Sequence, residues 1–388
     1  MTTPLVAGNR ITLLECGAEY FPALEAAIDS AQQEIHLETY IFADDGTGRR
    51  IASALCRAAR RGVTVRVLAD GFGARTLPAT LGPALIADGV QLRIYRPEVA
   101  TWKPQRNRLR RMHRKLVVVD QRIAFVGGIN IVDDLDVPGE KTPRYDYAVA
   151  VEGPLVPAIR SAARRLWLWL HWADPGRRDT SPAPLSVPAV CGPVAAALLV
   201  RDNLRHRRRI EAAYLKAIAT ARDEIILANA YFLPGKTLRR ALRNAARRGV
   251  RVTILLQGRV EYLLLHYAAR TLYAGFIAAG VRIVEYHRGF LHAKVAVVDA
   301  HWATVGSSNI DPFSLLLARE ANVVMENATF AATLRTSLLR HIREGGKEVA
   351  ASDLARRSRV GLLFSRMAYS LVRVMIALTR YGGSEYRE

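Results

Sequence analysis

The hydrophobic pattern of the chain alternates between helix-like and strand-like stretches, and the same succession occurs twice. Residues 49–71 have the pattern of an amphipathic helix that ends near Gly62, followed by a strand rich in Val and Leu. Residues 239–258 repeat this succession, with Gly249 in the place of Gly62. Glycine is favoured directly after a helix because it adopts the left-handed cap conformation at little cost. The pattern therefore predicts alternating strands and helices, which is typical of an α/β fold.

Two further pairs of segments extend the repeat over most of the chain. Residues 27–42 align with residues 217–232, and residues 112–130 align with residues 291–309. The order of the elements is the same in both copies. A solenoid needs three or more shorter units, so two long copies favour a different architecture. We expect two similar α/β sandwich domains, related by a pseudo-twofold axis and with the active site at their interface.

The repeat and the composition of its flanks predict the domain boundaries. The first half is expected at residues 1–173, a linker at 174–195, the second half at 196–350, and a basic amphipathic helix with a tail at 351–388. Residues 174–193 are rich in proline and polar side chains, which is typical of a surface linker. The helix before the linker carries three tryptophans that we expect in a core or interface: Trp167, Trp169 and Trp172.

The charge balance narrows the class of partner. The chain has 56 Lys and Arg against 35 Asp and Glu, a net charge of +21, which attracts nucleic acid, anionic lipid headgroups or phosphorylated substrates. Charge alone does not choose among them. Three scattered cysteines without CxxC spacing argue against a disulfide framework or structural zinc and favour a reducing, cytoplasmic environment. The chain has no secretory signal pattern and no apolar run long enough to span a membrane, so we expect a soluble or peripheral protein.

Two His-x-Lys pairs are the candidate chemistry. His113 and Lys115 begin one apolar strand, and His292 and Lys294 begin its counterpart. Side chains alternate along a strand, so the two members of each pair project from the same face. If the pairs meet across a twofold interface, one imidazole can attack phosphorus while the other protonates the leaving oxygen. The lysines would neutralise the non-bridging oxygens, and no metal ligand set is required.

Other polar residues near the pairs complete the candidate site. Asp120 and Asp299 complete the two motifs and are grouped with the candidate catalytic residues, although their place at strand ends favours a bracing role. Each histidine needs a partner for its second ring nitrogen, and the candidate orienting carboxylates are Asp146, after the first motif, and Glu320, after the second. The polar turns after the motifs supply the candidate phosphate-binding residues Asn130, Ser307, Ser308 and Asn309.

The sequences HRKLVVVD with GGIN, and HAKVAVVD with GSSN, resemble the paired motifs of the phospholipase D superfamily. Their flanks resemble bacterial cardiolipin synthases, most of all the shorter B type, which lacks the N-terminal transmembrane pair of the longer enzymes. The resemblance implies a phosphatidyltransferase that works without metal or cofactor by a ping-pong mechanism. In it, His113 is the nucleophile that forms a phosphohistidine and His292 is the general acid/base. The implied substrates are phosphatidylglycerol and, as an alternative partner lipid, phosphatidylethanolamine. A hydrolase or nuclease that uses water as acceptor is the alternative.

The C-terminal segment favours lipid over nucleic acid. On a helix, Arg359, Arg366, Arg373 and Arg380 form one stripe, and apolar side chains cover the remaining surface. Such a helix suits an anionic membrane interface, here the cytoplasmic face of the bacterial inner membrane, with packing on the domain as the alternative. Five arginines within residues 106–114 either bind a second lipid phosphate or form a solvated loop. The chain lacks the basic-aromatic motifs of a nucleic-acid module, so no nucleic acid partner is expected, and its oligomeric state stays open.

Overall fold

The computed structural model describes residues 3–97, 110–135, 142–172, 188–202, 206–260, 262–312, 314, 318–355 and 359–378. The predicted linker therefore lies largely outside the described residues. The first half contains these elements: β1 (Val6–Glu15), α1 (Cys16–Asp29), β2 (Glu34–Thr39), α2 (Gly46–Arg60), β3 (Thr64–Asp70), α3 (Gly82–Ala87), β4 (Gln91–Tyr95), β5 (Lys115–Val119), β6 (Ile123–Gly127), β7 (Tyr147–Glu152) and α4 (Val156–Trp172).

The second half repeats this order after the linker. Its elements are β8 (Val194–Arg201), α5 (Arg209–Thr220), β9 (Glu224–Asn229), α6 (Lys236–Arg247), β10 (Arg251–Gln257), α7 (Leu263–Arg270), α8 (Tyr273–Ile277), β11 (Arg282–Tyr286), β12 (Lys294–Val298), β13 (Trp302–Gly306), β14 (Glu320–Glu326) and α10 (Ala328–Gly345). A short strand β15 (Gly346–Glu348) and the helices α11 (Ala351–Ala355) and α12 (Arg359–Leu378) follow.

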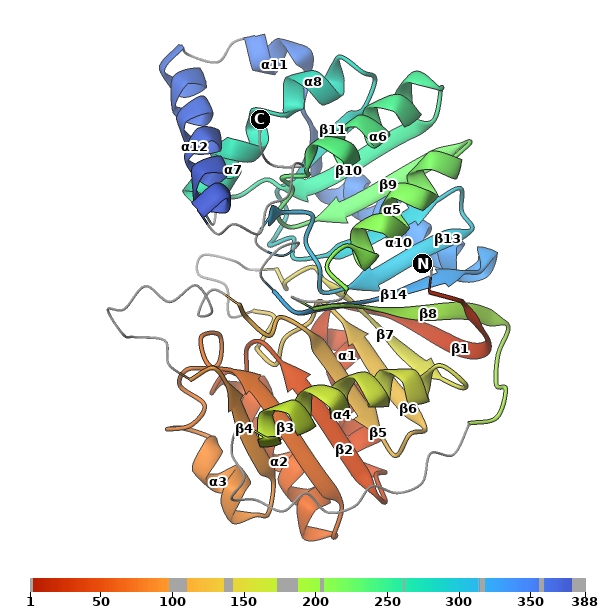
Figure 1. Ribbon diagram of the computed structural model, residues 1–388, viewed down its shortest axis with the longest axis vertical. Helices are drawn as coiled ribbons and strands as arrows, with labels where there is room; N and C mark the ends of the chain where they lie inside the picture. The colour runs from red at the N-terminus through yellow and green to blue at the C-terminus, as the bar shows by residue number, and fades with distance from the viewer. Residues whose placement is uncertain are drawn as a thin grey trace.

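The strands form one continuous sheet that passes through both halves (Figure 1). Its order is β15-β11-β10-β9-β12-β13-β14-β8-β1-β7-β6-β5-β2-β3-β4. The order read outward from β1 matches the order read outward from β8, and these two strands pair antiparallel at the centre. In each half the three outer strands of the repeat run parallel, and the motif strand runs antiparallel beside them. The predicted pseudo-twofold arrangement is confirmed.

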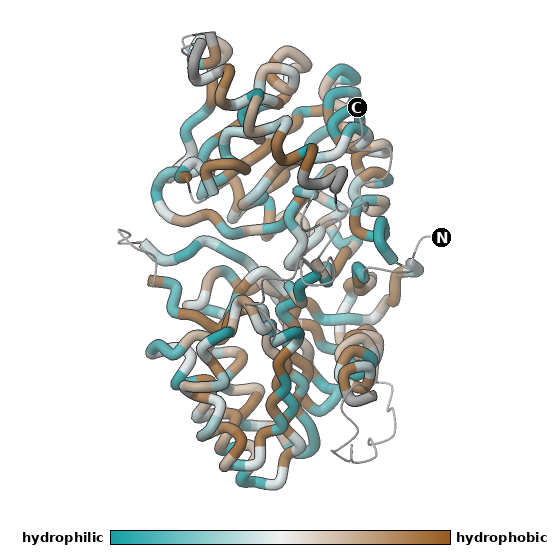
Figure 2. The backbone as a smooth tube through the Cα atoms, turned by 60° about the vertical axis from the view of Figure 1, so that its left-hand side comes forward, coloured by the Kyte–Doolittle hydropathy of each residue, from teal (hydrophilic) through white to brown (hydrophobic). Residues whose placement is uncertain are grey.

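Helices cover both faces of the sheet, so the strands are buried on both sides. The helices α1, α2 and α3 cover one face of the first half, as α5, α6 and α8 do in the second. On the other face, α4 packs on β2, β5 and β6, while α10 packs on β12 and β13. Figure 2 shows the hydrophobic stretches gathered within the two halves. The motif strands KLVVV and KVAVV are buried at every position, which explains why their sequences are continuously apolar after the lysine.

The turns predicted from glycine have the expected conformation. Gly62 follows α2 with φ +90°, and Gly249 follows α6 with φ +94°. Nothing lies near the position that a β-carbon would occupy at either glycine, so the backbone angle rather than space selects the residue. These two turns start the strands β3 and β10, whose carboxyl ends lie at the edge where the site is built.

Candidate active site

The two motifs meet at the centre of the molecule, where each histidine is held by the opposite half. The backbone N–H of His113 donates to the carbonyl of Arg319 at 3.0 Å, and the N–H of His292 donates to the carbonyl of Tyr145 at 2.8 Å. In return, the N–H of Arg319 donates to Arg111 and that of Tyr145 donates to Phe290. These reciprocal backbone bonds tie each catalytic segment to the opposite half without any side chain.

The imidazoles are paired with carboxylates across the same interface. His113 donates from Nδ1 to Glu320 at 3.0 Å, and His292 donates from Nδ1 to Asp146 at 2.6 Å. Each candidate orienting carboxylate therefore serves the histidine of the other half, a pairing that sequence spacing does not reveal. A carboxylate on Nδ1 fixes the tautomer in which Nε2 carries the lone pair. Both imidazoles thus present a potential nucleophile or base on the far side of the ring.

The electrostatics of the buried site keep both imidazoles neutral. Burial lowers the pKa of His113, and Lys115 adds to this, while Glu320 opposes it. Burial and the charge of Lys294 lower the pKa of His292 to about 3, against the opposing effect of Asp146. Burial would raise the pKa of Asp146, but Lys294 and His292 outweigh it, so this carboxyl is ionised. Neutral imidazole with a free Nε2 is the form that attacks phosphorus.

The lysines lie beside the histidines as the strand period predicts. Lys115 is 3% exposed and donates from Nζ to the carbonyl of His113 at 2.9 Å. Lys294 is fully buried, donates to the carbonyl of His292, and lies 3.6 Å from Asp146. Burial and the charge of Lys294 lower the pKa of Lys115 to about 7, although Glu320 opposes the shift. An arriving phosphate anion would favour the charged form of both amines.

A cavity of about 260 Å³ exposes these groups to a substrate. His113 and Asn130 reach it from the first half, and His292 and Asn309 from the second. The asparagines occupy matching positions in the repeat, and the Oδ1 atom of Asn130 accepts the N–H of Ile41 at 3.1 Å. Its amide N–H₂ group is then the part available to an anion. The cavity is thus lined by two imidazoles and two amides, and the two lysine amines lie behind the histidines, bonded to their backbone carbonyls.

These features match a known family, described as cardiolipin synthase, PLD-like domain, at residues 24–134 and 214–342. The chain belongs to this family. It is 42% identical over 381 residues to cardiolipin synthase B of Escherichia coli K12, covering 96% of this chain and 89% of that protein. It is 31% identical over 370 residues to cardiolipin synthase A of Pseudomonas putida, covering 94% of this chain and 74% of that protein. The predicted family is confirmed.

A solved structure supports the same fold. Phosphatidylserine synthase of Haemophilus influenzae superposes with a TM-score of 0.67 at 14% identity, covering 97% of this chain and 96% of that one. At this identity the likeness shows the fold alone. The two separate matches of the cardiolipin synthase family to this chain coincide with the two copies of the repeat, and each contains one motif lysine and its strand.

The motif aspartates lie outside the cavity of this cardiolipin synthase fold. Asp120 follows the far end of β5 and accepts three backbone N–H groups, from Gln32, Gln33 and Glu34, at 2.7–2.9 Å. Asp299 follows β12 and accepts three equivalent bonds at 2.8–3.0 Å. Because each lysine begins a five-residue strand and its aspartate follows the other end of that strand, their grouping with the catalytic residues is not supported. They brace the turns that start β2 and β9.

The polar turn of the second half also differs from expectation. Ser307 donates to the Glu320 carboxylate at 2.5 Å, and Ser308 bonds within the turn and to Asn322, so neither lines the cavity. We therefore do not propose them as phosphate ligands: Ser307 instead bonds to the carboxylate that accepts the Nδ1 proton of His113. In the first half Gly128 takes the equivalent place, because a β-carbon there would collide with the Asp146 carboxylate.

Several residues that line the cavity were not predicted from the sequence, and some arginines expected to bind phosphate do not reach it. The missed residues come from turns after the strands and from one loop: Tyr40, Arg144, Tyr231, Tyr262, Phe290 and Asp311. Tyr40 is the first residue after β2 and Tyr231 the second after β9, so the carboxyl ends of strands beside a motif were the available signal. Of the arginine cluster, Arg114 is buried against Glu38 at 2.7 Å, which removes it from phosphate binding. Arg106 and Arg108 lie outside the described residues.

Proposed function

We propose that this protein makes cardiolipin by moving a phosphatidyl group from one phospholipid to the glycerol hydroxyl of another. The observation that carries the proposal is the pair of imidazoles, one from each half, each oriented by a carboxylate and backed by a buried lysine around one cavity. This arrangement supports two successive in-line displacements at phosphorus, with a phosphohistidine between them. Membership of the cardiolipin synthase family supports the lipid acceptor.

The roles of the two histidines follow the family pattern. We assign the nucleophile to His113 and the general acid/base to His292. The first step forms a bond from Nε2 of His113 to phosphorus and breaks the bond to the headgroup oxygen, which takes a proton from His292. In the second step an incoming hydroxyl gives its proton to His292 while its oxygen bonds to phosphorus and the phosphohistidine bond breaks. His292 is neutral in the free site, so it must take up a proton when the phosphodiester binds. The negative charge of the phosphodiester raises the pKa of this ring and supports that uptake, and His292 then donates the proton in the first step.

The surface beside the cavity supports a membrane-bound substrate. Helix α12 buries its small residues Ser365, Ala368 and Val372, the last two against α7 (Figure 1). Its large apolar residues point outward and are 50–61% exposed: Leu363, Phe364, Met367, Leu371 and Val374. An ordinary surface helix of a soluble protein turns its large apolar side chains toward the core and its polar side chains toward water. The helix packs on the domain and still offers an apolar face, which supports the proposal that it also contacts a membrane.

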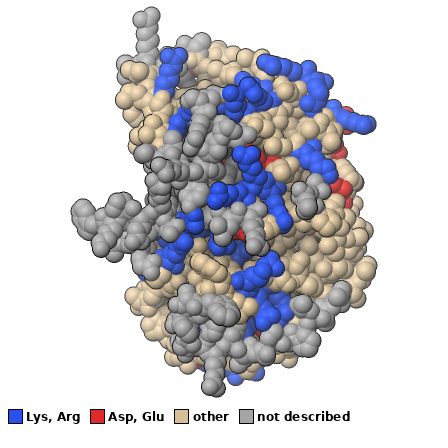
Figure 3. Space-filling model, in the orientation of Figure 1, with Lys and Arg blue, Asp and Glu red and all other residues tan. Residues whose placement is uncertain are grey.

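The cavity extends to the start of α7, the helix on which α12 packs. Tyr262 lines the cavity and directly precedes α7, whose first residue Leu263 is 61% exposed. Figure 3 shows Lys and Arg side chains gathered along the middle of this side of the molecule, with few acidic groups among them. Apolar and cationic surfaces together suit an anionic leaflet, such as the cytoplasmic face of a bacterial membrane. No described helix is long and apolar enough to cross a bilayer. We propose peripheral binding through α12.

Labelled phosphatidylglycerol, presented alone and together with phosphatidylethanolamine, tests the reaction. Cardiolipin among the products is the expected result, and phosphatidic acid as the only product would refute the transferase. Digestion of plasmid DNA by the same preparation would instead identify a nuclease. His113→Ala and His292→Ala are each expected to abolish turnover, since each step needs both rings, and full activity of either variant would contradict the paired site. Peptide mass spectrometry of the trapped phosphohistidine identifies the nucleophile.

A further inference from the structure

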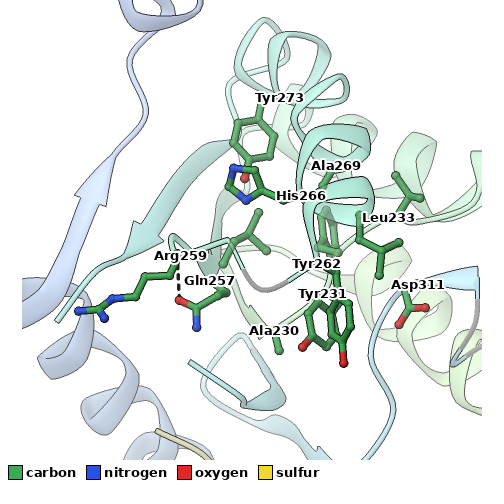
Figure 4. A pocket seen from close by; sticks show the side chains of 13 residues that line it. Ala230, Tyr231, Leu233, Gln257, Arg259, Tyr262, His266, Ala269, Tyr273 and Asp311 are labelled. Atoms are coloured by element: carbon green, nitrogen blue, oxygen red, sulfur yellow. Dashed lines mark hydrogen bonds between the residues drawn. The ribbon is translucent and has the colours of Figure 1, made fainter. Parts of the chain in front are cut away.

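A small chamber opens beside the catalytic cavity within the second half (Figure 4). It lies at the carboxyl ends of β9 and β10 and has a volume of about 40 Å³, room for roughly three water molecules. Tyr231, Tyr262 and Asp311 line both the chamber and the catalytic cavity, so the two spaces are neighbours. A space of this size next to a phosphodiester site suits a small headgroup and excludes an acyl chain.

Gln257 supplies an unused hydrogen-bond donor in the wall of this chamber. It is the last residue of β10 and only 7% exposed. Its amide oxygen accepts the backbone N–H of Arg259 at 3.3 Å, which orients the amide. Figure 4 shows the amide nitrogen on the side away from that bond. Nε2 is buried and bonds to no group in the part of the chain that the structure describes. A buried donor without a partner is unfavourable, which points to a ligand.

The corresponding residue of the first half has a structural role instead. Asp70 ends β3 opposite Tyr95, as Gln257 ends β10 opposite Tyr286. The Asp70 carboxylate accepts the backbone N–H groups of Met112 at 2.8 Å and Phe72 at 2.9 Å. The shared fold therefore does not require an open amide at this position. The Gln257 amide therefore distinguishes the second half of the active site from the first.

The chamber lies on the His292 side of the catalytic cavity. Ala230 is part of the chamber wall, and its N–H donates at 3.0 Å to the carbonyl of Ala293, the residue after His292. In an in-line displacement the leaving oxygen lies opposite the nucleophile and beside the general acid. With His113 as nucleophile, the headgroup oxygen therefore lies toward His292 and the headgroup extends toward the chamber.

We propose that Gln257 donates a hydrogen bond from Nε2 to a hydroxyl of a glycerol headgroup, and that the chamber selects glycerol in both half-reactions. This inference rests on the proposed function. The glycerol that leaves with a proton from His292 vacates the chamber. The glycerol hydroxyl of a second phosphatidylglycerol then enters the same place, returns its proton to His292 and displaces His113 from phosphorus. One site thus recognises both the leaving and the entering headgroup, since both occupy the same side of the phosphorus.

Hydrogen-bond chemistry distinguishes glycerol from ethanolamine here. A hydroxyl accepts a hydrogen bond and donates another, so it pairs with the Gln257 amide and with an acceptor such as Asp311. An ammonium group only donates, and it would leave the Gln257 donor buried and unpaired. A headgroup without any polar group at its end would also leave the Gln257 donor buried and unpaired. A site that pairs a substrate hydroxyl discriminates against its analogue mainly through this unpaired group, here by about tenfold.

Single-turnover cleavage of two labelled donors tests the proposal. Phosphatidylglycerol carries the hydroxyls and phosphatidylethanol lacks them. The variant Gln257→Met keeps the length of the side chain and removes the donor, and Gln33→Met makes the same change at an exposed position outside both cavities. We expect the wild type and Gln33→Met to prefer phosphatidylglycerol by about tenfold, and Gln257→Met to lose this preference through a slower reaction with phosphatidylglycerol alone. Gln257→Glu is expected to lower use of phosphatidylglycerol and raise use of phosphatidylethanolamine.

The outcomes separate this proposal from the proposed function. If the wild type forms cardiolipin and Gln257→Met retains its preference for phosphatidylglycerol, the headgroup role of Gln257 is refuted while the transferase stands. An equal loss with both donors would mean that Gln257 only supports the fold, which also overturns the proposal. If Gln257→Met does not fold, the ratio of phosphatidylglycerol to phosphatidylethanolamine cleavage by Gln257→Glu tests the proposal instead, and a ratio equal to that of the wild type refutes it. A wild type that cleaves neither donor refutes the function and the headgroup site together.

Discussion

Replacing Glu320 by glutamine tests the pairing of a carboxylate in one half with a histidine in the other. Glu320 is fully buried and accepts bonds from Nδ1 of His113 and from Oγ of Ser307. Glutamine keeps the shape and removes the charge. Its N–H₂ group must then face either the histidine or the serine. Ser307 can accept it by rotating its hydroxyl, whereas the imidazole can accept it only by moving its proton to Nε2.

The size of the loss depends on which arrangement forms. If the glutamine oxygen still faces His113, only the charge is lost, and a charge-assisted bond exceeds a neutral one by about 1–2 kcal/mol, or roughly tenfold in rate. If the imidazole changes tautomer, Nε2 is protonated and cannot attack, which in a comparable triad costs about 10⁴-fold. We expect kcat to fall by about 10²- to 10³-fold for Glu320→Gln, with KM little changed.

Cardiolipin formation and histidine ¹⁵N NMR together measure this effect. The crosswise bonds predict that Glu320→Gln alters the ring nitrogens of His113 and leaves those of His292 in place. Asp146→Asn, the matched variant, should do the opposite because Asp146 binds Nδ1 of His292. A decrease in kcat of less than about fivefold for Glu320→Gln, or ring signals that change at the histidine of the same half, would refute the reasoning.

Three further predictions address the buried lysine, the motif aspartate and the apolar helix. The pKa of Lys115 is lowered to about 7, so between pH 7 and its ordinary value of 10.5 the unfolded chain binds more protons and the unfolding free energy rises with pH. Lys115→Met should remove this slope, at most about 1.4 kcal/mol per pH unit in denaturation curves, and abolish activity. Asp120→Asn replaces one of two accepting oxygens and should lower the unfolding free energy by about 1–3 kcal/mol while kcat stays the same; a large loss of kcat would return Asp120 to the catalytic residues. Phe364→Ser with Met367→Ser should reduce sedimentation with anionic vesicles by tenfold or more, on the order of the transfer energy of two exposed apolar side chains, whereas Ile86→Ser on α3 should not; equal binding by all three proteins would contradict docking through α12.

Local patterns predicted the parts of the fold that depend on local interactions. The strand period placed Lys115 beside His113, and the glycine turns started β3 and β10 as expected. The repeat implied the pseudo-twofold arrangement because two equal copies with apolar strands can share one sheet. The position of Asp120 at a strand end also indicated its bracing role, which the three backbone bonds now explain.

The pairing of each carboxylate with the histidine of the opposite half could not be predicted from the sequence. Glu320 lies closer along the chain to His292 than to His113, yet it binds His113, because the antiparallel contact of β1 and β8 brings the start of each last strand beside the opposite motif. The bond from Ser307 to Glu320 is equally invisible, since serine in a glycine-rich turn is also a reasonable phosphate ligand. Such choices depend on tertiary distances of a few ångströms, which no local pattern records.

A duplicated fold supplies two equivalent histidines, but a ping-pong reaction needs them to act differently. The difference must come from positions where the copies diverge. Asp70 satisfies three backbone N–H groups in the first half, while the amide nitrogen of Gln257 in the second half has no partner among the residues that the structure describes. This substitution places the headgroup chamber on the side of His292, where the general acid must meet the leaving oxygen. The asymmetry that assigns the roles thus lies at the ends of β3 and β10, one strand away from the strands that adjoin the motifs, and it leaves the motifs themselves nearly identical.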